Sequence, residues 1–184
     1  MDFGSPGMDE IMFSYDDVYI RAIEAKDLPW LAECRNDPTT WLYLGTLDFA
    51  NTVKQLDWWK SSSLDKSKAN FVFCLKDGTK IGFVRMDEID HVNKSIRIGG
   101  DIHPTFRSQG YGTKMYKLLL AYCFNELNMH RIWLLVLDFN DAAVRLYTKM
   151  GFQMEGVQKE AIYRDGEYHD YLMMSIMRTE WIKD

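Results

Sequence analysis

The segment Arg107–Gly112 reads R-S-Q-G-Y-G and stands where a strand-like run gives way to a long helical pattern. Glycine at positions 110 and 112 lets the backbone approach an anion, because no Cβ atom stands in the way. The first N–H groups of a helix have no partner within the helix, and the helix dipole adds positive potential there. The segment therefore predicts a phosphate-binding site.

Two common phosphate-binding patterns do not fit this segment. The dinucleotide fingerprint G-x-G-x-x-G fails because Met115 stands where the third glycine is required. The P-loop pattern fails because Lys114 does not directly follow a glycine. What fits is R-x-x-G-x-G, a short pattern that a surface loop could also use merely to begin a helix.

The elements around this loop follow from hydrophobic periodicity and turn residues. We expect strands over 18–23, 71–75, 80–86, 95–102, 131–137, 152–161 and 168–177. We expect helices over 27–35 with Asp27 as cap, from 51 or 52 through 59, over 110–128 and over 141–150. The segment 35–38 should break the first helix, and Gly99-Gly100 suggests a bulge or a close backbone approach. This order predicts a mixed α/β sheet of about seven strands with helices on both faces.

Composition excludes several classes of protein. The chain has 184 residues, which suits one domain over 1–184, with residues 1–16 a leader or flexible. A net charge of -5 argues against a broad nucleic-acid surface, and no apolar run approaches the length of a membrane helix. Cys34, Cys74 and Cys123 lie far apart, which predicts neither a disulfide framework nor a zinc site and suits the cytoplasm.

A second motif follows the strand 131–137: Asn140, and then A-V-R-L-Y-T-K-M-G-F over 143–152. The two motifs in this order resemble the GNAT superfamily of acetyl-CoA-dependent N-acetyltransferases, and the resemblance covers residues 18–181. The chain is most similar to one branch of that superfamily, on the basis of three segments: R-N-D-P over 35–38, Glu155-Gly156, and residues 163–171. This branch contains ribosomal-protein N-terminal, spermidine and amino-sugar acetyltransferases.

The resemblance implies a GNAT-like, mostly antiparallel sheet with a central splay, acetyl-CoA as co-substrate and no metal. The pantetheine arm would lie between the end of strand 95–102 and strand 131–137. The residues implied to hold the coenzyme are Asp101, Ile102, His103, Arg107, Ser108, Gln109, Gly110, Tyr111, Gly112, Thr113 and Asn140. Tyr147 matches the family tyrosine, a general acid for the leaving thiolate, although packing alone would also explain it. Asn140 would bond the coenzyme arm or cap the following helix.

The general base is not evident from the sequence. An alkylamine with a pKa near 10.4 is mostly protonated at pH 7, so the enzyme must remove a proton. Many relatives carry a Glu on the strand before the pyrophosphate loop, where this chain has Ile96 and Arg97. Four other groups stay open as the base, some through a water: Asp87, Glu88, Asp101 and His103.

The acceptor is expected to be a primary amine of a small molecule, of the amino-sugar or polyamine type. The aromatic residues that could line its pocket are Trp41, Tyr43, Trp58, Trp59, Tyr163 and Tyr168. The carboxylates that suit an ammonium group are Asp87, Glu88, Asp165, Glu167 and Asp170. A protein N-terminal acetyltransferase and a non-catalytic acyl-CoA-binding module stay open as alternatives. No nucleic-acid or membrane partner is expected, and a homodimer is left open.

Overall fold

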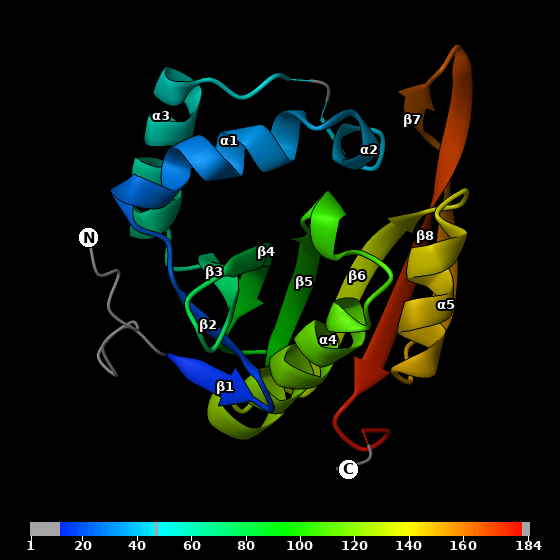
Figure 1. Ribbon diagram of the computed structural model, residues 1–184. Helices are drawn as coiled ribbons and strands as arrows, with labels where there is room; N and C mark the ends of the chain where they lie inside the picture. The colour runs from blue at the N-terminus through cyan, green and yellow to red at the C-terminus, as the bar shows by residue number, and fades with distance from the viewer. Residues whose placement is uncertain (1–11, 47, 182–184) are drawn as a thin grey trace.

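The computed structural model describes residues 12–46 and 48–181. Eight strands form one sheet in the order β1-β2-β3-β4-β5-β6-β8-β7 (Figure 1). The strands are β1 (Phe13–Tyr15), β2 (Val18–Ala22), β3 (Ala69–Leu75), β4 (Lys80–Asp90), β5 (Ser95–Ile102), β6 (Arg131–Leu137), β7 (Gln153–Arg164) and β8 (Glu167–Met177). Neighbours are antiparallel except β5 and β6, which run parallel. The predicted mixed, mostly antiparallel sheet is confirmed, with one strand more than expected.

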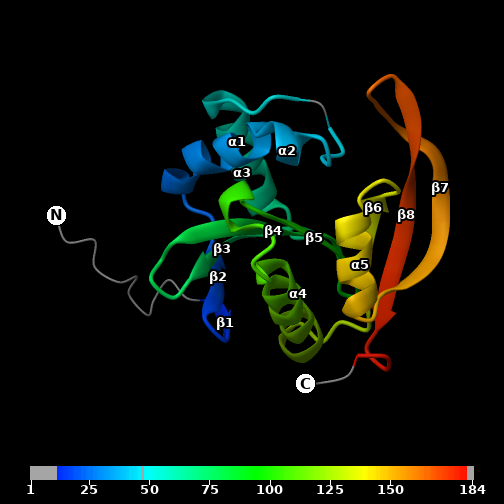
Figure 2. The ribbon, with the colours of Figure 1, turned by 45° about the vertical axis from the view of Figure 1, so that its right-hand side comes forward.

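Helices cover both faces of the sheet, as predicted. The helices are α1 (Leu28–Asn36), α2 (Pro38–Trp41), α3 (Thr52–Leu64), α4 (Tyr111–Ala121) and α5 (Asp141–Lys149). The first three lie over one face, and α4 lies against the other (Figure 2). In the described part of the chain, no helix has the length and apolarity needed to cross a membrane.

The central strands are buried on both faces, because successive side chains point to opposite sides of a strand. On β4, Val84 belongs to the large core beneath α4, whereas Phe83 belongs to a second core beneath α1. On β5, Ile96 and Ile98 also face the core of α4. It follows that residues 85 and 87 of β4, and 97, 99 and 101 of β5, lie on the face covered by α1–α3.

Two expectations for the first part of the chain are correct only in part. Phe13–Tyr15 forms β1 and pairs with β2, so the expected leader of residues 1–16 does not extend through this strand, while residues 1–11 lie outside the described part. Asp27 is the N-cap residue of α1, as expected, but its carboxylate makes no capping bond to that helix; it accepts hydrogen bonds from Arg21 and from the Glu24 N–H.

The R-N-D-P segment 35–38 ends one helix and begins another. The Asp37 carboxylate accepts hydrogen bonds from the N–H groups of Thr39 and Thr40 and thereby starts α2, which sequence reasoning missed. The Asn36 side chain donates to the Ala50 carbonyl and accepts from the Ala50 N–H, at 2.7 Å each. The segment therefore fixes the loop that follows α2.

The sheet splays between β5 and β6. In the described residues, the two strands pair only where Ser95–Arg97 meets Arg131–Trp133. Of the two alternatives expected at Gly99-Gly100, the close backbone approach is confirmed at position 100 and the bulge is wrong, since β5 keeps a continuous register with β4 from Arg97 to Ile102. Glycine is needed at position 100 for a close approach, because a Cβ there would lie 2.8 Å from Met115 Cε and 2.9 Å from the Phe83 carbonyl oxygen.

Candidate active site

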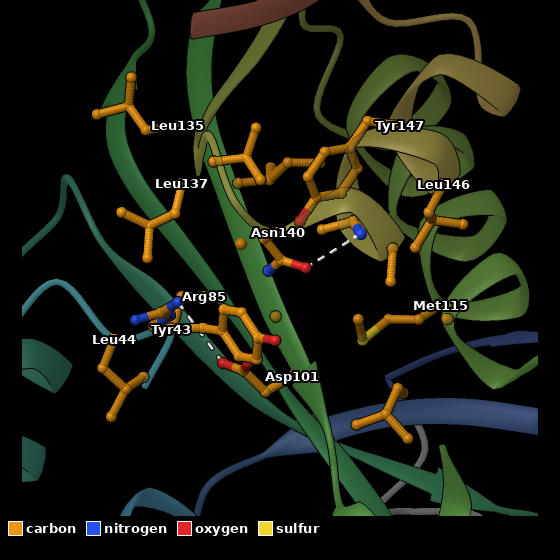
Figure 3. Close-up of a pocket in the computed structure, with 18 of the residues that line it drawn as sticks. Tyr43, Leu44, Arg85, Asp101, Met115, Leu135, Leu137, Asn140, Leu146 and Tyr147 are labelled. Atoms are coloured by element: carbon orange, nitrogen blue, oxygen red, sulfur yellow. Dashed lines mark hydrogen bonds and ion pairs between the residues drawn. The ribbon is translucent and has the colours of Figure 1, made fainter. Parts of the chain in front are cut away.

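The splay opens a cavity of about 750 Å³ between β5 and β6, a volume typical of small-molecule sites (Figure 3). Helices α4 and α5 supply one side, with Met115, Leu146 and Tyr147. The last turn of α1, residues 43–46 after α2, and the strands β4 and β5 supply the other. Of the residues predicted to hold the coenzyme, those that line the cavity are Asp101, Ile102, Arg107, Ser108, Gly112 and Asn140.

The predicted phosphate loop ends at the N-terminus of α4. Gly110 is the N-cap residue with φ +84, in the left-handed region that favours glycine. The first backbone bond of the helix runs from the Lys114 N–H to the Gly110 carbonyl at 3.3 Å. The N–H groups of Tyr111, Gly112 and Thr113 therefore precede the helical ladder, which is the arrangement that suits a phosphate.

Two side chains of this loop bind the protein itself. The Arg107 guanidinium donates to the Ile102 carbonyl at 3.0 Å and to the hydroxyls of Thr39 and Thr40 at 2.7 and 2.6 Å. Gln109 donates to the Thr105 carbonyl at 2.9 Å. Arg107 thus ties the loop to α2, and a direct bond from its side chain to the coenzyme stays a prediction.

Tyr147 on α5 lines the cavity and is 9% exposed. Its hydroxyl accepts a hydrogen bond from the Tyr116 hydroxyl at 3.1 Å, and the two rings meet edge to face. Burial raises the pKa of Tyr147, while the bond from Tyr116 acts in the opposite direction, because it stabilises the phenolate. Sequence reasoning missed Tyr116, although it follows Gly112 by one helical turn on the same face of α4.

Asn140 performs one of its two expected roles. Its amide oxygen accepts from the Ala143 N–H at 3.2 Å and caps α5. Figure 3 shows its amide nitrogen turned away from that helix and toward the cavity, where it can donate.

The candidates for the general base separate into two pairs. Asp87 and Asp101 line the cavity. Glu88 and His103 are not among the described residues that line it; Glu88 pairs with Arg97 at 3.3 Å, and the His103 ring stacks on Trp30. These two are therefore badly placed for the role.

The backbone of β5 offers donors to the splay. The His103 N–H donates to the Ile81 carbonyl on β4 at 2.8 Å, so it is already used. Because successive N–H groups of a strand point to opposite sides, those of Ile102 and Gly100 face β6. They are better placed for the coenzyme arm than the N–H groups of Asp101 and His103.

Most of the aromatic residues expected at the acceptor pocket lie elsewhere. Trp58 and Trp59 pack against the core beneath α1, and Trp59 Nε1 donates to the Ile23 carbonyl. Trp41 stacks on Phe49. Of the six residues named, only Tyr43 lines the cavity, and Tyr171 of β8, which the sequence did not single out, joins it.

The residues over 17–153 match the model of a family described as an acetyltransferase (GNAT) domain. The chain belongs to this family. It is therefore an acetyl-CoA-dependent N-acetyltransferase, as the two motifs predicted.

The spermidine acetyltransferases among the relatives support the predicted branch. The chain is 28% identical to the spermidine N(1)-acetyltransferase of Escherichia coli K12 over 94% of this chain and 92% of that protein. It is 24% identical to the L-amino acid N-acetyltransferase AaaT of Escherichia coli K12, over 86% of this chain and 97% of that protein. Among solved structures it resembles the spermidine N-acetyltransferase of Vibrio cholerae in complex with CoA and spermine, with a TM-score of 0.85, 26% identity, and coverage of 89% and 97% of the two chains.

Proposed function

We propose that the chain transfers an acetyl group from acetyl-CoA to a primary amine of a small molecule, of the amino-sugar or polyamine class, by direct attack in a ternary complex. The observation that carries the proposal is the splay. It opens one cavity that reaches from the N-terminus of α4 to Tyr147 and to the carboxylates of β4 and β5. Two relatives act, by their names, on spermidine and on L-amino acids, which supports a small acceptor. A relative of Bacillus subtilis (strain 168) bears the name Putative ribosomal N-acetyltransferase YdaF, which supports the protein N-terminal alternative.

Coenzyme binding follows from the residues on the α4 side. The pyrophosphate would sit on the N–H groups of Tyr111–Thr113, where the absence of a Cβ at Gly112 leaves room beside Leu146. The pantetheine arm would then enter the gap along the N–H groups of Ile102 and Gly100, with Asn140 donating from the opposite side. This arrangement delivers the thioester toward Tyr147.

The chemistry requires removal of a proton from the amine and donation of one to the thiolate. The amine nitrogen bonds the thioester carbonyl carbon, and the C–S bond then breaks. Tyr147 donates its proton to the leaving thiolate, and Tyr116 stabilises the phenolate that this transfer leaves. The phenolate regains a proton from the acetylated nitrogen, directly or through a water, while the first proton of the ammonium group goes to a carboxylate. Asp101, whose side chain is 23% exposed on the α1 face, binds the incoming ammonium group and takes its proton directly or through a water, with Asp87 as the other carboxylate within the cavity.

The test is a turnover assay that follows release of the CoA thiol with amino sugars, sugar nucleotides, polyamines and peptides as acceptors. We expect kcat/KM to be highest for a small primary amine. A preference for a peptide of about a hundredfold, or about 2.7 kcal/mol, would point to the protein N-terminal alternative. Tight acetyl-CoA binding with no transfer to any amine would favour the non-catalytic module.

We also propose that the protein forms a multimer and acts in the cytoplasm. A related spermidine N-acetyltransferase of Vibrio cholerae is described as dodecameric, which supports a multimer and leaves a homodimer as one form of it. Cys34, Cys74 and Cys123 are free and buried, which favours a reducing cytoplasm. Among the described residues, no group of three or more His, Cys, Asp or Glu side chains could hold a metal ion.

A further inference from the structure

The face of the sheet beneath α1 and α2 carries an uneven set of charges. Strand alternation places Arg85 and Asp87 of β4 on this face, and Arg97 and Asp101 of β5 beside them. All four side chains line the cavity, and Arg35 joins them from the last turn of α1. The part of the cavity that lies against this face, where we propose that the acceptor binds, is therefore lined by three arginines and two aspartates.

One of these arginines is fully balanced by acidic neighbours. Arg97 pairs with Asp87 at 3.5 Å and with Glu88 at 3.3 Å, and its guanidinium lies over the Trp133 ring. Its charge is thus compensated without any ligand.

Arg85 lies over the Phe83 ring, but it has one acidic neighbour, at a longer distance, where Arg97 has two. Its guanidinium crosses β5 over Gly99, where a Cβ would lie only 3.3 Å from Nη2, so glycine makes room for it. The Asp101 carboxylate is 3.8 Å from Nη2, which is too long for a hydrogen bond (Figure 3). The Arg85 Nε is buried and has no hydrogen-bond partner. A buried donor of this kind is costly unless something binds it.

Arg35 adds a second positive charge close to Arg85. Its guanidinium donates to the Thr46 hydroxyl at 2.6 Å, and it makes no ion pair within 4 Å with any carboxylate of the described residues. Burial, and next the charge of Arg85, lower the pKa of Arg35. The fold therefore holds two like charges close together in the cavity, and the charges of Asp101 and Asp48 offset them only in part.

We propose that Arg35 and Arg85 bind an anionic group of the acceptor, a carboxylate or a phosphate carried by the same small molecule as the primary amine. This rests on the function proposed above and narrows its acceptor class. An anion between the two guanidinium groups relieves their repulsion and accepts charge-assisted hydrogen bonds from their terminal Nη groups. The amine of the same molecule then lies near Asp101. A polyamine would bring further positive charge to the same place and is disfavoured.

Matched acceptors test the proposal directly. The pairs are glucosamine 6-phosphate with glucosamine, and an L-amino acid with its amide; spermidine is the third arm. In one of the two pairs, we expect kcat/KM for the charged acceptor to exceed that for the uncharged acceptor by about tenfold to a hundredfold, as hydrogen bonds to a charged group allow. The pair that shows the preference tells whether the anion is a phosphate or a carboxylate.

Substitutions then locate the anion site. Arg85→Gln and Arg35→Gln keep a polar side chain and remove the charge, so each should abolish most of the preference while acetyl-CoA binding and melting temperature stay near wild type. Lys159→Gln, which removes one positive charge from an exposed position on β7, should leave the preference intact. Arg85→Lys should keep part of it, because a lysine restores charge without the forked donors.

Calorimetry separates this inference from the function on which it rests. Glucosamine 6-phosphate and the L-amino acid are titrated into the CoA-bound protein, wild type and Arg85→Gln. One outcome is that a charged acceptor binds without being acetylated and that Arg85→Gln weakens its binding. This result would refute acetyl transfer to that amine but would support the anion site. Two results would overturn the anion site. One is a kcat/KM for the uncharged acceptors or spermidine that equals or exceeds that for the charged acceptors. The other is an Arg85→Gln protein that loses acetyl-CoA binding and keeps the preference for the charged acceptor.

Discussion

Removal of the Tyr116 hydroxyl should slow the chemical step by about tenfold. Tyr116→Phe keeps a ring that is only 1% exposed and removes the donor that lies 3.1 Å from the Tyr147 hydroxyl. In the resting enzyme this bond joins two neutral groups and contributes about 0.5–1.5 kcal/mol. As Tyr147 gives up its proton, its oxygen gains negative charge, and bonds to charged groups contribute about 1.5–3 kcal/mol. The difference of about 1–1.5 kcal/mol lowers the barrier and corresponds to about tenfold in rate.

The measurement is single-turnover kinetics at saturating acetyl-CoA with a good amine acceptor. The dissociation constant for acetyl-CoA should change little, because the ring remains and its contacts with Tyr147 and Phe152 are apolar. The unfolding free energy should fall by about 1 kcal/mol, the usual net worth of a neutral hydrogen bond.

The pH profile gives an independent readout. Tyr147 must be protonated to act as the acid, so the rate falls as pH rises through its pKa. The bond from Tyr116 holds that pKa lower than burial alone would. Tyr116→Phe therefore raises the pKa of Tyr147 further, and the alkaline limb of the profile moves to higher pH.

A double-mutant cycle decides whether Tyr116 acts through Tyr147. In a Tyr147→Phe background the phenol is gone, so the further change Tyr116→Phe should leave the rate nearly unaltered. Equal slowing by Tyr116→Phe in both backgrounds would refute the reasoning. A shift of the alkaline limb to lower pH would refute it as well.

Three further predictions concern the coenzyme, the acid and stability. Gly112→Asp should abolish acetyl-CoA binding measured by calorimetry, because its carboxylate would face the pyrophosphate, whereas Gly156→Asp at an open position should not; unchanged affinity in folded Gly112→Asp would exclude this loop. Tyr147→Phe should lower kcat and leave acetyl-CoA binding intact, and full turnover with chemistry rate-limiting would remove it as the acid. Bonds from Arg131, then Ser175, lower the pKa of Glu155 to about 2 from 4.5, so its stabilisation is complete above pH 4.5 and is lost as pH falls toward 2. Glu155→Gln should therefore cost about 1–2 kcal/mol at pH 7 in denaturant titrations, after allowance for solvent screening, and nearly nothing at pH 2; a cost independent of pH would contradict this.

Local patterns were sufficient for the elements that carry the motifs. The strands 95–102 and 131–137 were predicted with the bounds that the structure has. The first lies between a polar turn and Pro104, and the second is a nearly continuous apolar run. The start of α4 at the glycine loop followed from the same kind of signal. Strand β1 and helix α2 were missed, because three or four residues are too few to show a period.

Side-chain partnerships were beyond reach of these patterns. Nothing in the spacing shows that Tyr116 bonds Tyr147, which lies on another helix 31 positions later. Nor does spacing show that Arg107 reaches back to Thr39 and Thr40. The acceptor-pocket prediction was wrong for most of the aromatic residues for the same reason, since a tryptophan on a helix, such as Trp59, can pack in a core as readily as it can line a pocket.

The sequence by itself determined the family chemistry of this protein: a phosphate loop at a helix start, a tyrosine in a second motif, and the strands between which a coenzyme arm fits. These depend on residues close together in the chain, where spacing and backbone preference act directly. Only the tertiary structure brings Arg35 of α1 and Arg85 of β4 to the same cavity, because packing of segments far apart in the chain places them there. The anion site that we propose for the acceptor depends on this placement, which no local spacing shows.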